Sequence, residues 1–249
     1  MENYILECCV DSVESALNAE KGGASRLELC ANLPIGGTTP DLALFHQIRK
    51  NSDIRIHVLI RPRFGDFHYS KYEMEIMREE IRMFREAKAQ AVVIGVLDAD
   101  GNLDISSMEK LIEEAGEMKI TLHRAFDVCK DPFKTMEEAI KLGVNTILTS
   151  GQQQSAWEGR DMIRRLICQA EGRIDIMAGS GIDAQAIRKL QAVTGGTSYH
   201  MSGKIILDSP MRYRKQEVSM GLPSMSEYEI WRTSEEKVRE AAKVLKNII

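Results

Sequence analysis

Short apolar stretches and longer amphipathic stretches alternate along the whole 249-residue chain. The apolar stretches are rich in Ile, Val, Leu and Thr, as buried strands are. They begin near Ile5, Arg26, Ile56, Ala91, Ile120, Thr146, Asp175 and Ser198. Their mean spacing is about 28 residues, the length of one strand, one helix and two short loops. The pattern therefore predicts eight strand and helix units.

The stretches between the strands carry start and stop signals of helices. Thr39 followed by Pro40 is typical of a helix start, whereas Gly22-Gly23, Gly116 and Gly143 are typical of helix ends. The expected helices cover about 12–21, 41–50, 72–87, 106–115, 133–142, 157–169, 184–193 and 234–247. One composition runs through residues 1–249 without a linker, which predicts a single domain.

Eight strands alternating with eight helices predict an α/β fold, a (β/α)8 TIM barrel. The alternative, a doubly wound open sheet, normally has fewer strands at this length. A Gly-rich dinucleotide fingerprint is also missing after the first strand, where Glu7-Cys8-Cys9-Val10-Asp11 leads directly into a helix. Residues 203–233 show no clear periodicity, so we expect either a functional loop there or an arm across a subunit interface.

The alternation within each strand predicts which side chains face the barrel interior. A charge facing the helix layer would be buried among apolar groups, so the charged positions should face inward. On the first strand this places Glu7 and Cys9 inside, and on the second it places Arg26, Glu28 and Cys30 inside. Each strand then brings a carboxylate and a thiol toward the C-terminal rim, where barrel enzymes have their active sites.

Other polar residues are expected at the same rim. The third strand ends at Arg61 and Arg63, and the fifth at His123, with Asp127 in the loop that follows. The candidate catalytic residues are Glu7, Glu28, Arg61, His123 and Asp127. Small residues follow strands six to eight, where backbone N–H groups can bind an anion such as phosphate. The candidate binding residues are Arg63, Thr149, Ser150, Gly151, Gly179, Gly181 and Ser202.

Each of these features also has a purely structural interpretation. Glu7, Glu28 and Arg61 could form a paired charge network that only fills the barrel. His123 could be a hydrogen-bonded core histidine, and the glycines could serve only as turn residues. Both interpretations stay open at the level of sequence.

Charge and cysteine content narrow the class of protein. Lys and Arg number 33 against 37 Asp and Glu, a net charge of −4, and no basic block is present, which argues against nucleic acid as a partner. No apolar run is long enough to span a membrane, and the N-terminus lacks the pattern of a signal peptide, which predicts a cytoplasmic protein. The five cysteines are irregularly spaced, so free thiols in a reducing compartment are expected.

Many specific strings, in one order over nearly the whole chain, resemble the CutC family of copper homeostasis proteins. They are Leu6-Glu7-Cys8-Cys9, Arg26-Leu27-Glu28-Leu29-Cys30, Gly36-Gly37-Thr38-Thr39-Pro40, Ile60-Arg61-Pro62-Arg63, Gly65-Asp66-Phe67, Tyr69-Ser70, His123-Arg124-Ala125-Phe126-Asp127, Leu148-Thr149-Ser150-Gly151 and Ser209-Pro210-Met211-Arg212-Tyr213-Arg214. The chain departs from the family pattern at Leu122 and Ser180. The resemblance implies a cytosolic barrel, a homo-oligomer of two or more subunits, and a role in copper handling.

The residues and the family resemblance together predict two alternative functions, copper binding and turnover of a small anionic metabolite. Cu(I) prefers thiolate and thioether ligands, so Cys9 and Cys30 on adjacent strands are the candidate copper ligands. The charged rim is richer than a carrier needs and resembles an enzyme pocket for a small anionic metabolite, phosphorylated or carboxylated. In a third interpretation, a non-catalytic scaffold, residues 203–233 would plug the rim.

Overall fold

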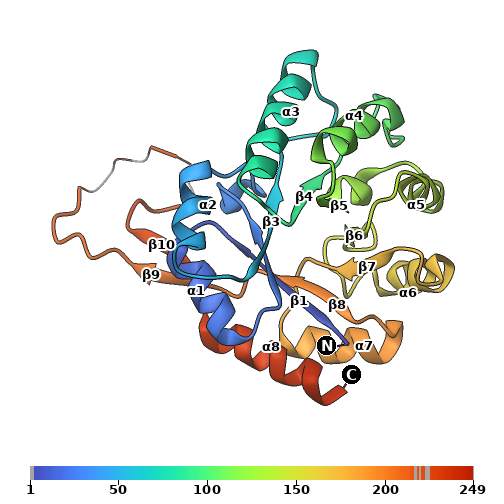
Figure 1. Cartoon of the computed structure of the whole chain (residues 1–249). Helices are drawn as coiled ribbons and strands as arrows, with labels where there is room; N and C mark the ends of the chain where they lie inside the picture. Colours follow the sequence, from blue (N-terminus) through green and yellow to red (C-terminus); the bar gives the residue numbers. More distant parts are fainter. Residues whose placement is uncertain (1–2, 216–217, 219, 222–224, 249) are drawn as a thin grey trace.

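A computed structural model describes residues 3–215, 218, 220–221 and 225–248. Eight parallel strands close in chain order into a barrel, with β8 paired to β1, and helices surround it (Figure 1). The barrel strands are β1 (Ile5–Val10), β2 (Arg26–Leu29), β3 (Arg55–Leu59), β4 (Ala91–Ile94), β5 (Lys119–Leu122), β6 (Thr146–Thr149), β7 (Asp175–Ala178) and β8 (Ser198–Met201). The predicted TIM barrel is confirmed.

The helices lie close to their predicted positions. They are α1 (Val13–Gly22), α2 (Leu42–Arg49), α3 (Lys71–Glu86), α4 (Ile105–Ala115), α5 (Pro132–Lys141), α6 (Arg160–Ala170), α7 (Ala184–Thr194) and α8 (Glu235–Ile248). Local side chains define several helix starts, since Ser12 caps α1, and Ser70 forms a reciprocal capping box with Glu73 at α3. Helix α6 starts three residues later than expected, because Trp157 and the two residues after it form turns.

The predicted alternation of the strands is confirmed. The outward side chains of β1 and β2, among them Leu6, Leu27 and Leu29, are fully buried in the apolar core under the helices. The strand register sets Glu7 opposite Arg26 on one side and opposite His200 on the other. The side chains of Glu7 on β1, Arg26 on β2 and His200 on β8 therefore lie in one polar layer inside the barrel.

A hairpin that the sequence pattern did not reveal lies within residues 203–233. Strands β9 (Lys204–Asp208) and β10 (Glu229–Thr233) pair in antiparallel fashion, and the segment extends outward on the side of α1 and α2 (Figure 1). The backbone N–H of Thr233 donates to Ser15 Oγ at 3.1 Å, which fixes the base of the hairpin to α1. Residues 216–217, 219 and 222–224 of this predicted arm lie outside the described residues. Within the described part of the chain, no helix is both long and apolar enough to cross a membrane.

Candidate functional site

A cavity of about 530 Å³ opens at the mouth of the barrel, where the C-terminal ends of the strands meet. Its polar lining comes from strands and loops that are far apart in the sequence, because the barrel brings all strand ends to one rim. The polar lining residues are Cys9, Glu28, Arg61, His123, Arg124, Asp127, Ser180, His200 and Ser202. The remaining wall is formed by Gly36, Gly181 and the apolar residues Leu33, Ile35, Leu59, Phe67, Val128, Leu148, Ile182 and Met201.

Glu7 lies below this cavity at the centre of a buried charge network. Its carboxylate accepts from Arg26 Nε at 2.5 Å and lies 2.8 Å from His200 Nδ1, and His57 Nδ1 is 3.6 Å away. Burial alone would raise the pKa of Glu7, but the Arg26 charge and the His200 hydrogen bond outweigh burial and hold this pKa below its usual range. Glu7 is therefore ionised at neutral pH and paired with Arg26, whereas burial lowers the pKa of His57 to about 4 and keeps that ring neutral.

Three potential metal ligands lie next to this network. One ligand atom each from Cys9, Glu28 and His200 lies within 4.8 Å of the others. Burial favours the neutral form of His200, but its acidic neighbours Cys9 and Glu28 outweigh burial and raise the pKa of His200 well above 6.5. Sequence reasoning misses His200 as a site residue, although it shares its strand face with Ser202, two positions later.

The predicted ligand Cys30 lies beside this group. Its thiol donates to Glu28 Oε2 at 3.4 Å, and it packs with Cys9, Leu59 and Val93 in one small buried cluster. Burial and the neighbouring Glu28 raise the pKa of the Cys30 thiol well above 9. All five cysteines are free thiols, as expected, and Cys168 is the exposed one.

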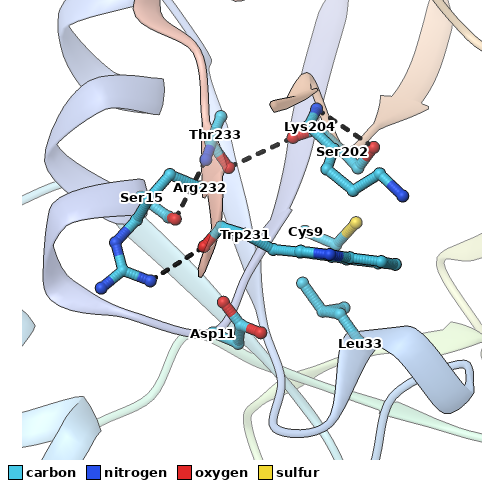
Figure 2. Close-up of a pocket in the computed structure, with 9 residues that line it drawn as sticks. All are labelled: Cys9, Asp11, Ser15, Leu33, Ser202, Lys204, Trp231, Arg232 and Thr233. Carbon is cyan, nitrogen blue, oxygen red and sulfur yellow. Dashed lines mark hydrogen bonds between the residues drawn. The ribbon is translucent and has the colours of Figure 1, made fainter. Parts of the chain in front are cut away.

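A smaller cavity of about 170 Å³ reaches Cys9 from the side of the hairpin (Figure 2). The Trp231 indole lies next to Cys9 and Leu33, and Lys204 Nζ is 3.3 Å from the centre of that ring. The hydroxyl of Thr233 donates to the Ser202 carbonyl at 3.1 Å, which joins β10 to the end of β8. The hairpin thus supplies one wall beside the Cys9 thiol.

The two arginines after β3 lie in different surroundings. Arg61 lines the mouth cavity, and its guanidinium donates to the carbonyls of Gly37 at 3.0 Å and Gly65 at 2.9 Å. Arg63 turns instead to the start of α3, where Nε donates to Glu73 at 2.6 Å. Arg63 therefore does not line the mouth cavity, because Glu73 and Asp66 hold its guanidinium at the start of α3.

Asp127 occupies the backbone N–H groups that were expected to bind an anion. The backbone N–H groups of Ser150 and Gln152 donate to its carboxylate at 3.0 and 3.2 Å. The Thr149 hydroxyl donates to the same carboxylate, and the N–H of Gly151 donates to Thr149 Oγ1 at 2.8 Å. This loop therefore holds an anion that belongs to the protein itself.

The remaining predicted binding residues follow β7 and β8. Gly181 and Ser202 line the cavity, whereas Gly179 is packed so tightly that an added Cβ would lie 2.6 Å from Leu148 Cδ1. The structure thus brings Glu28, Arg61, His123 and Asp127 together at the mouth. Glu7 lies beneath them.

The comparisons with known proteins agree with this architecture. The family model described as CutC family matches residues 4–205. A family protein CutC of Parabacteroides distasonis is 45% identical over 237 residues, which is 94% of this chain and 98% of its own length. The chain belongs to the CutC family. A human relative named copper homeostasis protein cutC homolog is 42% identical, over 99% of this chain and 90% of its own length.

Solved structures show the same fold. A CutC protein from Streptococcus agalactiae matches with a TM-score of 0.76 at 31% identity, over 80% of this chain and 98% of its own. Thiamine phosphate pyrophosphorylase from Pyrococcus furiosus matches at 15% identity with a TM-score of 0.60, a likeness of fold alone. The human relative and the Streptococcus agalactiae protein are both named for copper homeostasis.

Proposed function

We propose that this CutC protein binds Cu(I) at the barrel mouth, with Cys9 as the thiolate ligand and His200 as the nitrogen ligand. The observation that carries the proposal is the convergence of Cys9, Glu28 and His200, whose ligand atoms lie within 4.8 Å of one another. The Cys30 thiol, bonded to Glu28, supplies a second soft donor at the edge of this group. Copper is here the cargo of the protein.

The donor types fit Cu(I). Thiolates are its preferred ligands among protein side chains, and imidazole also suits copper. The contact of His200 Nδ1 with Glu7 leaves Nε2 to face Glu28 and the cavity, at 3.7 Å from Glu28 Oε2. Metal-bound histidines usually have such a carboxylate on the other ring nitrogen, which orients the ring and raises its basicity. We therefore propose Glu7 as the residue that orients His200.

Cu(I) binding would release protons. The thiol of Cys9 must lose its proton, and so must His200 Nε2, before they can donate an electron pair. A reducing cytoplasm keeps both copper and these thiols in the required state, which is why we place the function there. We also expect the protein to act as a homo-oligomer of two or more subunits, as the family resemblance implies.

The test is an anaerobic competition titration with a chromophoric Cu(I) chelator in the presence of a non-thiol reductant. We expect Cys9→Ser and His200→Asn to weaken Cu(I) binding by more than about tenfold. Residues that only orient a metal ligand already contribute about tenfold or more to metal affinity, and a direct ligand should contribute at least as much. Cys30→Ser should weaken binding too. Cys168→Ser, which changes the exposed thiol, is the matched control and should leave binding unchanged. Equal affinity in the wild type and in Cys9→Ser would refute the proposal.

A second candidate function is binding or turnover of a small anionic metabolite. The volume of the mouth cavity, about 530 Å³, favours it, because this is the size range of small-molecule sites and far exceeds the volume of one ion. Calorimetric titration of organic carboxylates and of inorganic phosphate against the metal-free protein tests this candidate.

A further inference from the structure

We infer that the wall of the mouth cavity around His123 is a binding subsite for a small organic carboxylate, with the His123 ring as a hydrogen-bond donor to a ligand oxygen. The inference rests on the second candidate function and is independent of copper. The donors of the copper proposal sit on β1, β2 and β8, whereas His123 follows β5.

The first observation is an unsatisfied donor. His123 lines the cavity and is 4% exposed, and its Nε2 has no hydrogen-bond partner among the residues that the structure describes. Its Nδ1 accepts from the backbone N–H of Ala125 at 3.2 Å, so in the neutral ring the proton is on Nε2. An unpaired buried N–H is costly, and a ligand oxygen would remove that cost.

The protonation state agrees with a neutral donor. Burial, together with the positive charge of Arg61, lowers the pKa of His123 to about 3. At neutral pH the ring is therefore uncharged, and Nε2–H can donate while Nδ1 still accepts. The large majority of buried polar side-chain atoms in folded proteins have a hydrogen-bond partner, so the unpaired Nε2 calls for an explanation such as a ligand.

The surrounding backbone and side chains hold the ring in one orientation. A Cβ on Gly95 would lie 2.6 Å from His123 Cε1, so only glycine leaves room for the ring at that point of β4's end. On another side, the Phe67 ring packs on His123 with 4.8 Å between ring centroids. Arg61 in turn lies 5.0 Å from the centre of the Phe67 ring. The ring is thus held in one orientation, and because Nε2 is itself buried, a ligand oxygen reaches it by displacing a neighbouring side chain of the cavity wall.

Charge in the cavity favours a monoanion over phosphate. Arg124 lines the cavity and is 44% exposed in its side chain; it uses one N–H toward Asp127 at 2.7 Å and another toward Ser150 Oγ at 2.9 Å. A guanidinium carries five N–H groups, so others remain for a ligand. Glu28 and Asp127 lie on the same cavity and would repel a dianion. The N–H groups after β6 are already taken by Asp127.

The apolar part of the cavity wall indicates that the remainder of the ligand is hydrophobic. Phe67, Leu59, Leu148 and Val128 line the same cavity, which suits a carboxylate with a hydrophobic body. Polar groups that fix orientation and an apolar wall that binds the remainder are the usual composition of a small-molecule site. Benzoate and pyruvate, a larger and a smaller carboxylate, are therefore the probes, and inorganic phosphate is the comparison anion.

The test is calorimetric titration of the three probes against the metal-free full chain. We expect benzoate to bind, and His123→Phe, which keeps a ring and removes the donor, to weaken it more than about tenfold. His46→Phe changes an exposed histidine on α2 and should leave benzoate affinity unchanged. In case His123→Phe fails to fold, the ¹⁵N resonance of His123 Nε2 in the wild type provides a second readout, and it should shift as benzoate is added.

The outcomes separate this inference from the function on which it rests. Phosphate binding that His123→Phe leaves unchanged, without carboxylate binding, would overturn the carboxylate subsite and keep the second candidate function. Carboxylate binding that neither moves the Nε2 resonance nor responds to His123→Phe would also overturn the role of His123. The absence of binding by all three probes at millimolar concentration would overturn both.

Discussion

Glu7 Oε1 lies 2.8 Å from His200 Nδ1, although 193 positions separate the two residues in the chain. The contact exists because β8 pairs with β1 and closes the barrel, with Glu7 and His200 in register. Closure of the fold and assembly of the candidate copper site are therefore the same event. Loss of this contact should affect both.

Glu7→Gln tests whether this buried carboxylate stabilises the closed barrel. The substitution removes the charge that pairs with Arg26, whose side chain is only 8% exposed, and leaves a buried cation without its partner. We expect the free energy of unfolding to fall by about 3–5 kcal/mol, the usual cost of breaking a buried ion pair. Urea denaturation at pH 7 measures it.

Glu137→Gln is the matched control for Glu7→Gln. Glu137 pairs with Arg173 at 2.8 Å, but Arg173 is exposed and Glu137 is partly exposed, so the pair should add little to stability. A similar loss of unfolding free energy in the two variants would contradict the conclusion that the buried Glu7 ion pair stabilises the barrel more than an ordinary surface ion pair does. Cu(I) affinity should also fall in Glu7→Gln alone.

The depressed pKa of His123 predicts how stability depends on pH. The unfolded chain binds a proton at this histidine near pH 6.5, whereas the folded chain does so only near its pKa of about 3. Between these values the unfolded state holds more protons, so stability falls as the pH is lowered below 6.5. Each pH unit costs up to about 1.4 kcal/mol for one such group. Urea denaturation at pH 7, 6 and 5 should show a shallower decline in His123→Phe.

Asp127→Asn should loosen the loop after β6. An amide cannot accept from all the N–H groups that now meet the carboxylate, and its own NH₂ group would face backbone donors. We expect a loss of about 1.5–3 kcal/mol, the value of a hydrogen bond to a charged group. Amide hydrogen exchange should become faster at Ser150 and Gln152. Unchanged protection of these two amides would show that the carboxylate does not hold the loop.

Trp231→Ala should expose Cys9 to thiol reagents. Cys9 is 9% exposed and lies beside the indole of Trp231, which the hairpin brings to it (Figure 2). In a Cys168→Ser background, reaction with a thiol-specific chromogenic disulfide should be slow before the change and faster after it. Trp157→Ala removes the other tryptophan of the chain and should have no effect. A further Cys9→Ser substitution should abolish the gain.

Spacing and alternation alone predicted much of the fold. A barrel strand has one face toward the helices and one toward the interior, so a charge such as Glu7 or Glu28 determines the orientation of its whole strand. For this reason the inward residues of β1 and β2 could be predicted from the sequence. The strand starts agree within one residue, because each strand is a local run of apolar residues.

Individual side-chain contacts were harder to predict than the convergence of the strand ends. His200 joins the site through the pairing of β8 with β1, which the predicted barrel implies, and its strand face, shared with the predicted residue Ser202, was the signal that could have revealed it. Glu73 attracts Arg63 to the start of α3, and Arg124, for which no role was predicted, lies at the mouth beside Asp127. The β9 and β10 strands pair across a long connection, and Ile206 and Leu207 are exposed on the hairpin, so the alternation typical of half-buried strands is missing.

The carboxylate of Asp127 on the N–H groups after β6 has a consequence for selectivity. A group tethered to the same chain competes with free solutes at an effective concentration far above the millimolar level. Inorganic phosphate or a nucleotide would therefore have to displace the Asp127 carboxylate before it could bind these N–H groups. We therefore expect the loop after β6 to discriminate against anions that bind through backbone N–H groups, while the other groups that line the mouth cavity stay available to a ligand.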